Sequence, residues 1–403
     1  MHILLIHQAF ASLDEPGGTR HHELARFFAS KGHKVTVIAS PISYLTGRSR
    51  DEHVHWISRE NLDERVTILR VYTYPALHKS FVHRIFSFLS FMVSSFIIGL
   101  SVKDVDIVWG TSPPIFQGLT ASLLATIKRV PFIFEVRDLW PAFAVAVGVL
   151  KNPFLIRASE WLERFLYHSA ENIIVNSPGF ISHVTEHGGL SITLIPNGAD
   201  PAMFDPSNRG LRFRKQYHLE NKFIVLYAGA HGLSNDLGNI LKAANLLRKQ
   251  PNIIFILVGD GKEKPHLVQK ADEMRLPNIL FLPPISKREI PEILAAADAC
   301  IATLKPIEMY KTVYPNKVFD YMAAGRPVIL AIDGVIKEII EEANAGIPVP
   351  PGNPSSIANA VMQLNKDPNK ATEMGIHGRQ IIEARFSREK LAEEFLQVIN
   401  SLV

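Results

Sequence analysis

Short apolar segments of strand length alternate with helical segments along most of the chain, and this alternation occurs in two separate series. The first series runs from Ile3–His7 to Asn172–Asn176, and the second runs from Phe223–Tyr227 to Ala299–Thr303. Strands that alternate with helices predict parallel sheets covered by helices on both faces. At 403 residues the chain is also too long for one compact core. We therefore predict an α/β fold with two doubly wound, Rossmann-like domains.

A turn-rich stretch separates the two series and predicts where the domains meet. From Pro196 it reads P-N-G-A-D-P-A-M-F-D-P, which contains many residues that favour turns. We place an N-terminal domain at residues 1–195 and a C-terminal domain at 196–385, and we expect a final helix at about 386–403 to pack back on the N-terminal domain. Open α/β sheets bind ligands beyond the carboxyl ends of their strands. We therefore expect the two domains to face each other across a cleft that holds the ligand.

The charge and the single cysteine narrow the class of protein. A net charge of +4 and a pI near 9.0 suit a phosphate-bearing ligand or an anionic membrane surface, and the chain lacks the dense basic tract of nucleic-acid binders. Cys300 is the single cysteine, which excludes a disulfide within the chain and fits a reducing compartment. The N-terminus, M-H-I-L-L-I-H-Q, predicts a first strand rather than a signal peptide. We expect a cytoplasmic protein that does not bind nucleic acid.

The segment 315–330, P-N-K-V-F-D-Y-M-A-A-G-R-P-V-I-L, predicts an anion-binding helix start. Asn316 is a good N-cap, a helix of about two turns begins at Lys317, and Gly325 fits the position just past its C-cap. The unpaired N–H groups and the positive dipole end of such a helix attract phosphate, and Lys317 adds a full positive charge. Asp320 supplies a carboxylate that can accept hydrogen bonds from a ribose. The alternative is an ordinary crossover helix in which Asp320 only favours the dipole.

Two groups of residues in the N-terminal half follow the ends of strands. Gly17 and Gly18 form a turn after the first strand, and Arg20 is either within reach of a phosphate or an ordinary surface arginine. The second group lies at the end of a later strand: Glu135, Arg137 and Asp138. A carboxylate at a strand end can take a proton from an acceptor hydroxyl, and Asp138 is our candidate. Pairing of Arg137 with Asp138 for structural reasons is the alternative.

The segment 85–102, I-F-S-F-L-S-F-M-V-S-S-F-I-I-G-L-S-V, contains no charged residue. It reaches the lower limit for a membrane span, but a span here would divide the sheet, so we exclude it. It is either a buried crossover helix or a helix in the membrane interface. The polar residues at its rim would be Lys79, His83, Arg84 and Lys103. Because a helix that is apolar all round is not expected to face water, we favour membrane contact through residues 81–103.

The motifs of both halves, taken together, resemble one protein family. In chain order they are G-G-T-R-H, E-V-R-D-L-W-P, S-P-G-F, I-P-N-G-A-D, Y-A-G-A-H-G, V-G-D-G and P-N-K-V-F-D-Y-M-A-A-G-R-P-V. Their order and spacing, over essentially the whole chain, resemble family-4 glycosyltransferases of the GT-B fold, in particular the bacterial surface-polysaccharide branch similar to fucosamine-type transferases. The resemblance implies a retaining transfer from a nucleotide-activated sugar, with no bound metal and no other cofactor.

The same motifs assign the site residues. The nucleotide-sugar would be bound by Gly17, Gly18, Arg20, Gly229, His231, Gly232, Gly259, Asn316, Lys317, Val318 and Asp320. The acceptor would be bound by Glu135, Arg137 and Asp138. Catalysis would fall to Asp138 and Lys317. No metal ligands are assigned, and the adjacent His21, His22 and Glu23 cannot all face one ion.

Several positions depart from the family pattern. Its final motif has two glutamates eight positions apart, of which the second is Asp320 here and the first is Thr312, which cannot act as an acid. The arginine usual after the first strand of the C-terminal domain is replaced by His231 in G-A-H-G. We expect Lys317 to supply the charge for the diphosphate. The histidine that many relatives carry after the mid-domain strand is Arg137.

The resemblance implies a UDP-sugar donor, with an N-acetylated amino sugar or a deoxy sugar as candidates. We expect a lipid-linked or saccharide acceptor, a peripheral location on the inner face of the cytoplasmic membrane, and a role in polysaccharide or lipopolysaccharide assembly. Two alternatives remain open, a nucleotide-sugar epimerase of the same two-domain architecture and a non-catalytic nucleotide- or polysaccharide-binding protein. A Rossmann dehydrogenase is disfavoured because neither half carries the dinucleotide glycine fingerprint followed by its ribose-binding acid.

Overall fold

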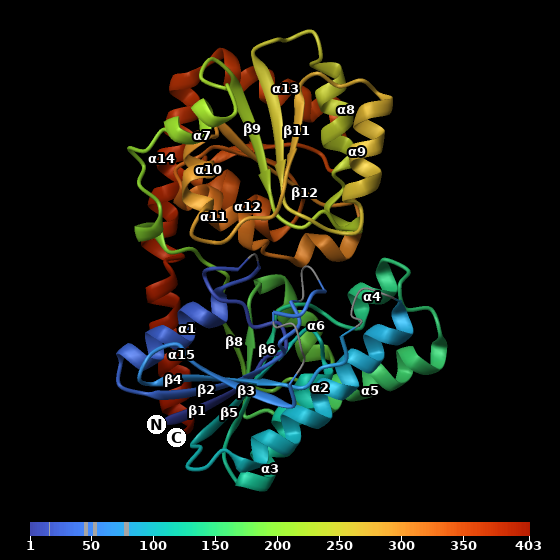
Figure 1. Cartoon of the computed structure of the whole chain (residues 1–403), viewed down its shortest axis with the longest axis vertical. Helices are drawn as coiled ribbons and strands as arrows, with labels where there is room; N and C mark the ends of the chain where they lie inside the picture. Colours follow the sequence, from blue (N-terminus) through green and yellow to red (C-terminus); the bar gives the residue numbers. More distant parts are fainter. Residues whose placement is uncertain (16, 44–46, 51–54, 76–79) are drawn as a thin grey trace. The chain divides into compact units, whose positions relative to one another are not determined.

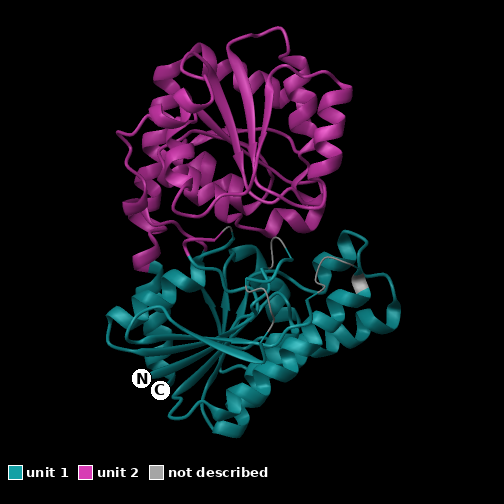
Figure 2. Cartoon of the chain, in the orientation of Figure 1, with its two compact units in different colours: residues 1–12, 17–196, 391–403 teal, residues 13–16, 197–390 magenta. Residues whose placement is uncertain are grey.

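The computed structural model of the chain describes residues 1–15, 17–43, 47–50, 55–75 and 80–403. It has two compact units, each built around a mostly parallel sheet (Figures 1 and 2). Unit 1 comprises Met1–Ser12, Gly17–Pro196 and Leu391–Val403, and unit 2 comprises Leu13–Pro16 and Asn197–Lys390. These features confirm the predicted α/β fold with two Rossmann-like domains. Lys79, expected at the rim of the apolar helix, lies outside the described residues.

The strands of unit 1 lie in the order β3-β4-β2-β1-β5-β6-β7-β8. Their bounds are β1 (His2–Ile6), β2 (Lys34–Ala39), β3 (Ile57–Asn61), β4 (Val66–Val71), β5 (Ile107–Ser112), β6 (Phe132–Val136), β7 (Asn172–Val175) and β8 (Ile192–Leu194). Neighbouring strands are parallel except for the edge strand β3, which is antiparallel to β4. The sequence of β3 is mostly polar, and four of its five residues are exposed. An exposed antiparallel edge strand tolerates polar residues on its faces.

Helices cover both faces of the unit 1 sheet (Figure 1). Their bounds are α1 (Arg20–Ser30), α2 (Phe81–Ser101), α3 (Phe116–Lys128), α4 (Ala142–Ala146), α5 (Pro153–Ser169), α6 (Ile181–Glu186) and α15 (Arg388–Leu402). Neighbouring residues of β5 show the two faces, because side chains alternate along a strand. The ring of Trp109 lies 4.7 Å from that of Phe395 in α15, whereas a Cβ on Gly110 would lie 2.6 Å from Ala121 in α3. Thus α1 and α15 cover one face, and α2, α3 and α5 cover the other.

Unit 2 contains a parallel sheet with strand order β11-β10-β9-β12-β13-β14. The strands are β9 (Phe223–Ala228), β10 (Ile253–Val258), β11 (Ile279–Leu282), β12 (Ala299–Thr303), β13 (Val328–Ala331) and β14 (Gly346–Pro348). The helices are α7 (Leu211–Gln216), α8 (Gly238–Leu246), α9 (Lys264–Glu273), α10 (Ile290–Ala296), α11 (Asn316–Ala323), α12 (Val335–Ala343), α13 (Pro354–Lys366) and α14 (Pro368–Arg385). In β9, Ile224 and Leu226 face the core beneath α11 and α12, and Val225 and Tyr227 face the core beneath α8 and α13.

The apolar segment 85–102 forms most of α2, which packs against the sheet on one side. A Cβ on Gly99 would lie 2.4 Å from Leu124 of α3, and the Ser94 hydroxyl donates to the Tyr72 carbonyl at 2.6 Å. Residues Val82–Ser101 are long and apolar enough to cross a membrane by length and composition alone. A span is nevertheless excluded because α2 connects β4 to β5 within one sheet. In the 18-residue window of highest hydropathy, 28% of this segment is buried, so α2 is not a fully buried crossover helix.

Candidate active site

The start of α11 in unit 2 has backbone N–H groups that can bind an anion, as the sequence predicted, but its N-cap differs from the prediction. Pro315, not Asn316, occupies the N-cap position, and Asn316 is the first helical residue. The predicted cap by Asn316 is therefore wrong, and no described side chain caps the first turn. The N–H of Val318 donates to the Pro315 carbonyl at 3.1 Å, so the backbone contact predicted for Val318 is already used within the protein. The N–H groups ahead of it in the first turn remain suited to an anion.

The amine of Lys317 lies beside the loop that follows β9. Its Nζ donates to the Tyr227 hydroxyl at 2.6 Å and to Asn235 Oδ1 at 3.1 Å. It also lies 4.1 Å from the centroid of the Tyr227 ring, a cation–π distance. Burial lowers the pKa of Lys317 to about 7. Neither Tyr227 nor Asn235 carries a negative charge, so a bound phosphate would supply an anionic partner for this amine.

Two glycine loops at the carboxyl ends of β9 and β10 approach each other closely. A Cβ on Gly259, whose φ is +145°, would lie 1.9 Å from the carbonyl oxygen of Gly229. A Cβ on Gly261, whose φ is +154°, would lie 2.5 Å from the carbonyl oxygen of His231. Around Gly232 there is more space, since the nearest atom to its Cβ position is 3.4 Å away. The glycines thus let the two loops pack backbone to backbone.

The ring of His231 is fully buried in this loop region. Among the described residues, neither Nδ1 nor Nε2 of His231 has a hydrogen-bond partner. Burial lowers the pKa of His231 to about 4, with Lys264 as a further cause, so the ring is neutral at pH 7. A buried imidazole normally satisfies its nitrogens. The ring nitrogens of His231 therefore call for a hydrogen-bond partner from a ligand or a water.

The carboxylate of Asp320, which we expected to bind a ribose, already forms an ion pair within the protein. Its Oδ2 accepts from Lys287 Nζ at 2.6 Å, and both side chains are largely buried. Sequence reasoning missed Lys287, which lies 33 positions away in the loop between β11 and α10. Thr312, at the position of the family's first glutamate, donates its hydroxyl to the Met309 carbonyl at 2.7 Å. A ribose at Asp320 would share its carboxylate with Lys287.

In unit 1, the structure gives Arg20 and Glu135 an internal role instead of the predicted ligand contacts. Arg20 Nε lies 3.0 Å from Glu135 Oε1, and its terminal nitrogens donate to the carbonyls of Ile195 and Pro196. Glu135 Oε2 lies 2.6 Å from His21 Nε2, and all three side chains are buried. Burial would raise the pKa of Glu135, but His21 and Arg20 outweigh it and hold that pKa well below its usual range. This cluster locks α1 to β6.

Of the other predicted unit 1 residues, Gly17 and Gly18 are exposed, whereas Arg137 and Asp138 are partly buried. Both glycines are exposed ahead of α1, and a Cβ on Gly18 would meet no atom within 4 Å. Arg137 is partly buried and donates from Nε to Thr111 Oγ1 at 2.8 Å. Burial raises the pKa of Asp138 to about 7, although the charge of Arg137 and the N–H of Leu139 partly offset this effect. A carboxylate with that pKa can exchange a proton at neutral pH.

Comparison with known proteins decides the family. The glycosyl transferase 4-like domain matches residues 17–198, and glycosyl transferases group 1 matches residues 210–381. The chain is a family-4 glycosyltransferase of the GT-B fold. It is 26% identical to the putative colanic acid biosynthesis glycosyl transferase WcaI of Escherichia coli K12, over 77% of this chain and 78% of that relative. It is 23% identical to the probable glycosyltransferase WbjE of Pseudomonas aeruginosa, over 78% and 79% of the two chains.

Solved structures agree with the GT-B fold of this glycosyltransferase. Sucrose-phosphate synthase from Thermosynechococcus elongatus superposes with a TM-score of 0.81 at 18% identity, covering 100% of this chain and 98% of that one. HepE of Anabaena, solved with UDP and glucose, superposes with a TM-score of 0.74 at 17% identity, covering 100% of both chains. At these identities the likeness establishes the fold alone.

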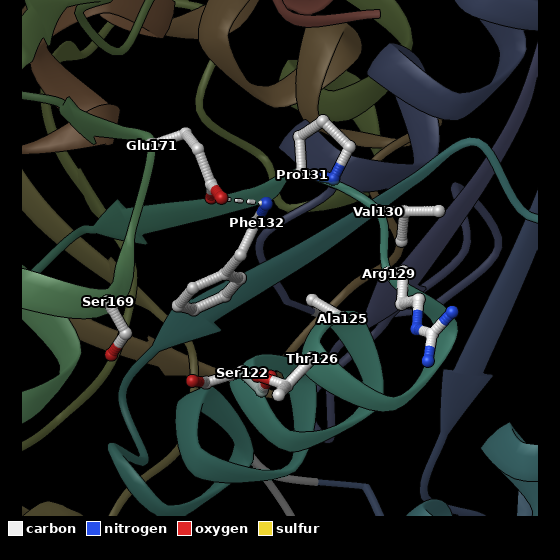
Figure 3. Close-up of a pocket in the computed structure, with 9 residues that line it drawn as sticks. All are labelled: Ser122, Ala125, Thr126, Arg129, Val130, Pro131, Phe132, Ser169 and Glu171. Atoms are coloured by element: carbon white, nitrogen blue, oxygen red, sulfur yellow. Dashed lines mark hydrogen bonds between the residues drawn. The ribbon is translucent and has the colours of Figure 1, made fainter.

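A pocket of the glycosyltransferase lies apart from these residues, in unit 1 (Figure 3). It has a volume of about 390 Å³ and is lined by the end of α3, the start of β6 and the junction of α5 with β7. Glu171 lies between α5 and β7, and its carboxylate accepts a hydrogen bond from the Phe132 N–H at 2.6 Å. The pocket lies where β6 and β7 begin, whereas Asp138 follows the carboxyl end of β6. The pocket is therefore at the other end of the strands from Asp138 and is not part of the candidate site.

Proposed function

We propose that this glycosyltransferase moves a sugar, with retention, from a UDP-sugar to a lipid-linked saccharide during assembly of a cell-surface polysaccharide. The observation that carries the donor assignment is in unit 2, where buried His231 lies near the amine of Lys317 and the start of α11. Among the described residues, neither ring nitrogen of His231 has a hydrogen-bond partner and no side chain caps that helix. HepE binds UDP, and the name of WcaI places that relative in colanic acid biosynthesis. Retention rests on the family resemblance.

In the proposed reaction, the bond between the anomeric carbon and the diphosphate oxygen breaks, and the acceptor oxygen bonds to that carbon. The electron pair of the broken bond remains on the UDP leaving group. Lys317 and the first N–H groups of α11 stabilise the developing charge, and neutral His231 donates one hydrogen bond. Loss of one such donor typically costs roughly 3–4 kcal/mol of transition-state stabilisation. The acceptor proton passes to Asp138 or to the leaving phosphate.

The deciding experiment is a panel of UDP- and GDP-sugars assayed for nucleotide release, with and without a polyprenyl-diphosphate sugar acceptor. We expect one UDP-sugar to release UDP in an acceptor-dependent manner. Donor conversion without acceptor would instead identify an epimerase, and UDP binding without any turnover would identify a binding protein. Either outcome would overturn the proposal.

Lys317→Ala tests the donor site within that assay. We expect transfer to fall at least about a hundredfold because the leaving diphosphate loses its ammonium partner. Lys311→Ala is the matched control, since Lys311 is an exposed lysine that pairs with Glu308. Near-normal turnover by Lys317→Ala, with an unchanged melting temperature, would remove Lys317 from the mechanism.

We also propose that unit 1 contacts an anionic bilayer, which would bring the enzyme to a lipid-linked acceptor. Six apolar residues with helical spacing form an exposed stripe on α2, each 37–58% exposed: Val82, Phe86, Leu89, Val93, Ile97 and Leu100. The neighbouring α3 adds exposed Leu123 and Ile127 to the same helical layer. The outer face of α5 carries Phe154, Arg157, Trp161, Arg164 and Phe165, all exposed. Aromatic and arginine side chains together favour the interface of an anionic membrane.

A further inference from the structure

A cluster of ligand-type side chains lies in unit 1, between α5 and α6. It consists of Glu163 from α5, His183 from α6 and His187 directly after α6. One potential ligand atom from each residue lies within 4.8 Å of the other two. Glu163 is 1% exposed and His183 is 19% exposed, so a buried carboxylate faces two imidazoles that solvent can reach. None of the residues that we assign to the sugar donor or to the acceptor belongs to this cluster.

The spacing of the two histidines explains why their rings meet. Residues four apart on a helix lie on one face, so His183 and His187 both point toward α5. Their rings stack with centroids 4.0 Å apart and an interplanar angle of 18°. Two histidines on one helical face with a glutamate from a second helix form a His₂Glu set, which is a zinc-type combination of ligands.

Hydrogen bonds already orient these side chains. Tyr167 donates its hydroxyl to Glu163 Oε1 at 3.0 Å, and His183 Nε2 lies 2.9 Å from the same oxygen. His187 Nδ1 lies 2.8 Å from the His183 carbonyl oxygen. A carbonyl oxygen can only accept, so Nδ1 of His187 carries the proton and its Nε2 keeps a lone pair. Fixing the tautomer of a histidine through its second nitrogen is what metal sites require.

We propose that Glu163, His183 and His187 bind a divalent cation of the zinc class, which clamps α5 to α6. The ion would take the place of the proton on His183 Nε2, which is released to solvent, while Nδ1 of that ring carries the proton of the neutral imidazole. A water would complete a tetrahedral shell. Zinc bonds of about 2.0–2.2 Å in a tetrahedral shell imply ligand atoms roughly 3.3–3.6 Å apart. To reach that spacing, the two rings have to rotate out of their present stacked arrangement so that their nitrogen lone pairs point at one ion. Mg²⁺ and Ca²⁺ are disfavoured because both prefer oxygen ligands.

This clamp uses no residue assigned to the donor or the acceptor. Its expected effect is on unit 1 itself, where an ion would cross-link two helices that otherwise meet through Glu163, Tyr167 and His183. A ligand that binds only the folded state stabilises it by mass action. Zn²⁺ at about 100 times its Kd would thus raise the ratio of folded to unfolded protein about a hundredfold.

The test uses the full chain without a histidine tag, stripped of metal by dialysis against a chelator. Zn²⁺ is titrated in competition with a chromophoric chelator, and melting temperature is measured with and without Zn²⁺. We expect one tight site per chain and a higher melting temperature. His187→Gln is expected to weaken binding at least about tenfold and to remove the thermal effect. His266→Gln, at an exposed position on α9, is the matched control and is expected to behave as wild type.

A second variant distinguishes a built site from chance binding by surface histidines. Tyr167→Phe keeps the packing of α5 and removes the hydroxyl that orients Glu163, and we expect it to weaken Zn²⁺ binding about 10–100-fold. Equal Zn²⁺ affinity in wild type and His187→Gln, or no Zn²⁺-dependent rise in wild-type melting temperature, would overturn the proposal. Neither result depends on turnover, so the proposed transfer is tested independently.

Discussion

Lys317 shows how burial can change what a single residue does. Its pKa of about 7 means that the free protein loses much of the ammonium charge just above neutrality. A bound diphosphate stabilises the charged form and therefore raises that pKa. We expect the affinity for UDP to be highest below pH 7 and to fall by up to about tenfold per pH unit above it, because binding must then take up a proton. Isothermal titration between pH 6 and 9 measures this slope.

Lys317→Met separates this effect from other titrations. The variant removes the amine but keeps much of the side-chain volume, so its weaker UDP affinity is expected to be flat across the same pH range. If wild type and Lys317→Met show the same pH slope, the proton is taken up elsewhere.

The pKa of Asp138 is expected to set the acid limb of the pH profile of transfer. A base must be deprotonated to accept a proton, and the pKa of Asp138 is about 7. We expect kcat/KM for transfer to rise as Asp138 loses its proton and to fall as Lys317 loses its own, which gives a narrow bell-shaped profile centred near pH 7. Asp138→Asn is expected to lose the rising limb together with most of the activity. An unchanged profile in this variant would assign the proton to the leaving phosphate.

Stability provides a control for Asp138→Asn. The pKa of Asp138 is raised in the folded protein from its ordinary value of 3.8. The folded state therefore binds its proton more tightly, so this residue lowers stability as pH rises through that interval. Asp138→Asn is expected to be at least as stable as wild type at pH 8 by urea unfolding. A clear loss of stability would mean that its activity reports misfolding.

The roles of some site residues could be predicted from the sequence, whereas the roles of others depend on contacts that exist only in the fold. The glycines after β9 and β10 were predictable because a tight turn at a strand end has a local signature. The partner of Asp320 was not, because Lys287 is distant in the sequence and the pairing exists only in the fold. Arg20 and Glu135 show the same limit, since a charged residue buried in a pair has the same local pattern as one that awaits a ligand.

At the scale of elements, the buried cluster of Arg20, His21 and Glu135 joins α1 to β6. Removing one member of a buried pair leaves an uncompensated charge. We expect Glu135→Ala to lower the free energy of unfolding by about 3–5 kcal/mol, as measured by urea titration. The matched control is Glu393→Ala, which breaks the exposed Lys31–Glu393 pair and is expected to cost at most about 1 kcal/mol. Equal losses would show that the buried cluster contributes no more than a surface pair.

Helix α2 also shows what an element's sequence can and cannot reveal. Its helical character and its lack of charge were plain from segment 85–102, but apolar residues on all sides do not indicate which side packs. The small residues decide this, because Gly99 and Ser94 permit close approach to α3 and to the chain near Tyr72. Phe91 is buried on the packed side, and the exposed stripe from Val82 to Leu100 lies on the side that does not pack.

At the scale of the molecule, the exposed layer of α2, α3 and α5 predicts membrane binding. We expect the protein to float with vesicles containing anionic phospholipid and to float less with neutral vesicles, because Arg157 and Arg164 accompany the apolar residues. A variant with Phe86, Val93 and Ile97 changed to Ser is expected to bind on the order of a hundredfold more weakly, since each change removes buried apolar area at the membrane.

The control variant carries Leu233→Ser and Leu246→Ser, two exposed apolar residues of unit 2. It is expected to float like wild type. Wild-type protein that stays at the bottom of the gradient, or a triple variant that floats equally well, would contradict the membrane proposal.

The order of folding follows from where the last helix packs. Phe395 of α15 lies against Trp109 and Phe28, with ring centroids 4.7 Å and 5.8 Å away. Both partners are synthesised before unit 2, whereas Phe395 is synthesised after it. On the face of the unit 1 sheet that α1 and α15 share, the area under α15 therefore stays open while unit 2 is translated. The nascent enzyme exposes the apolar side chains of that area throughout this interval.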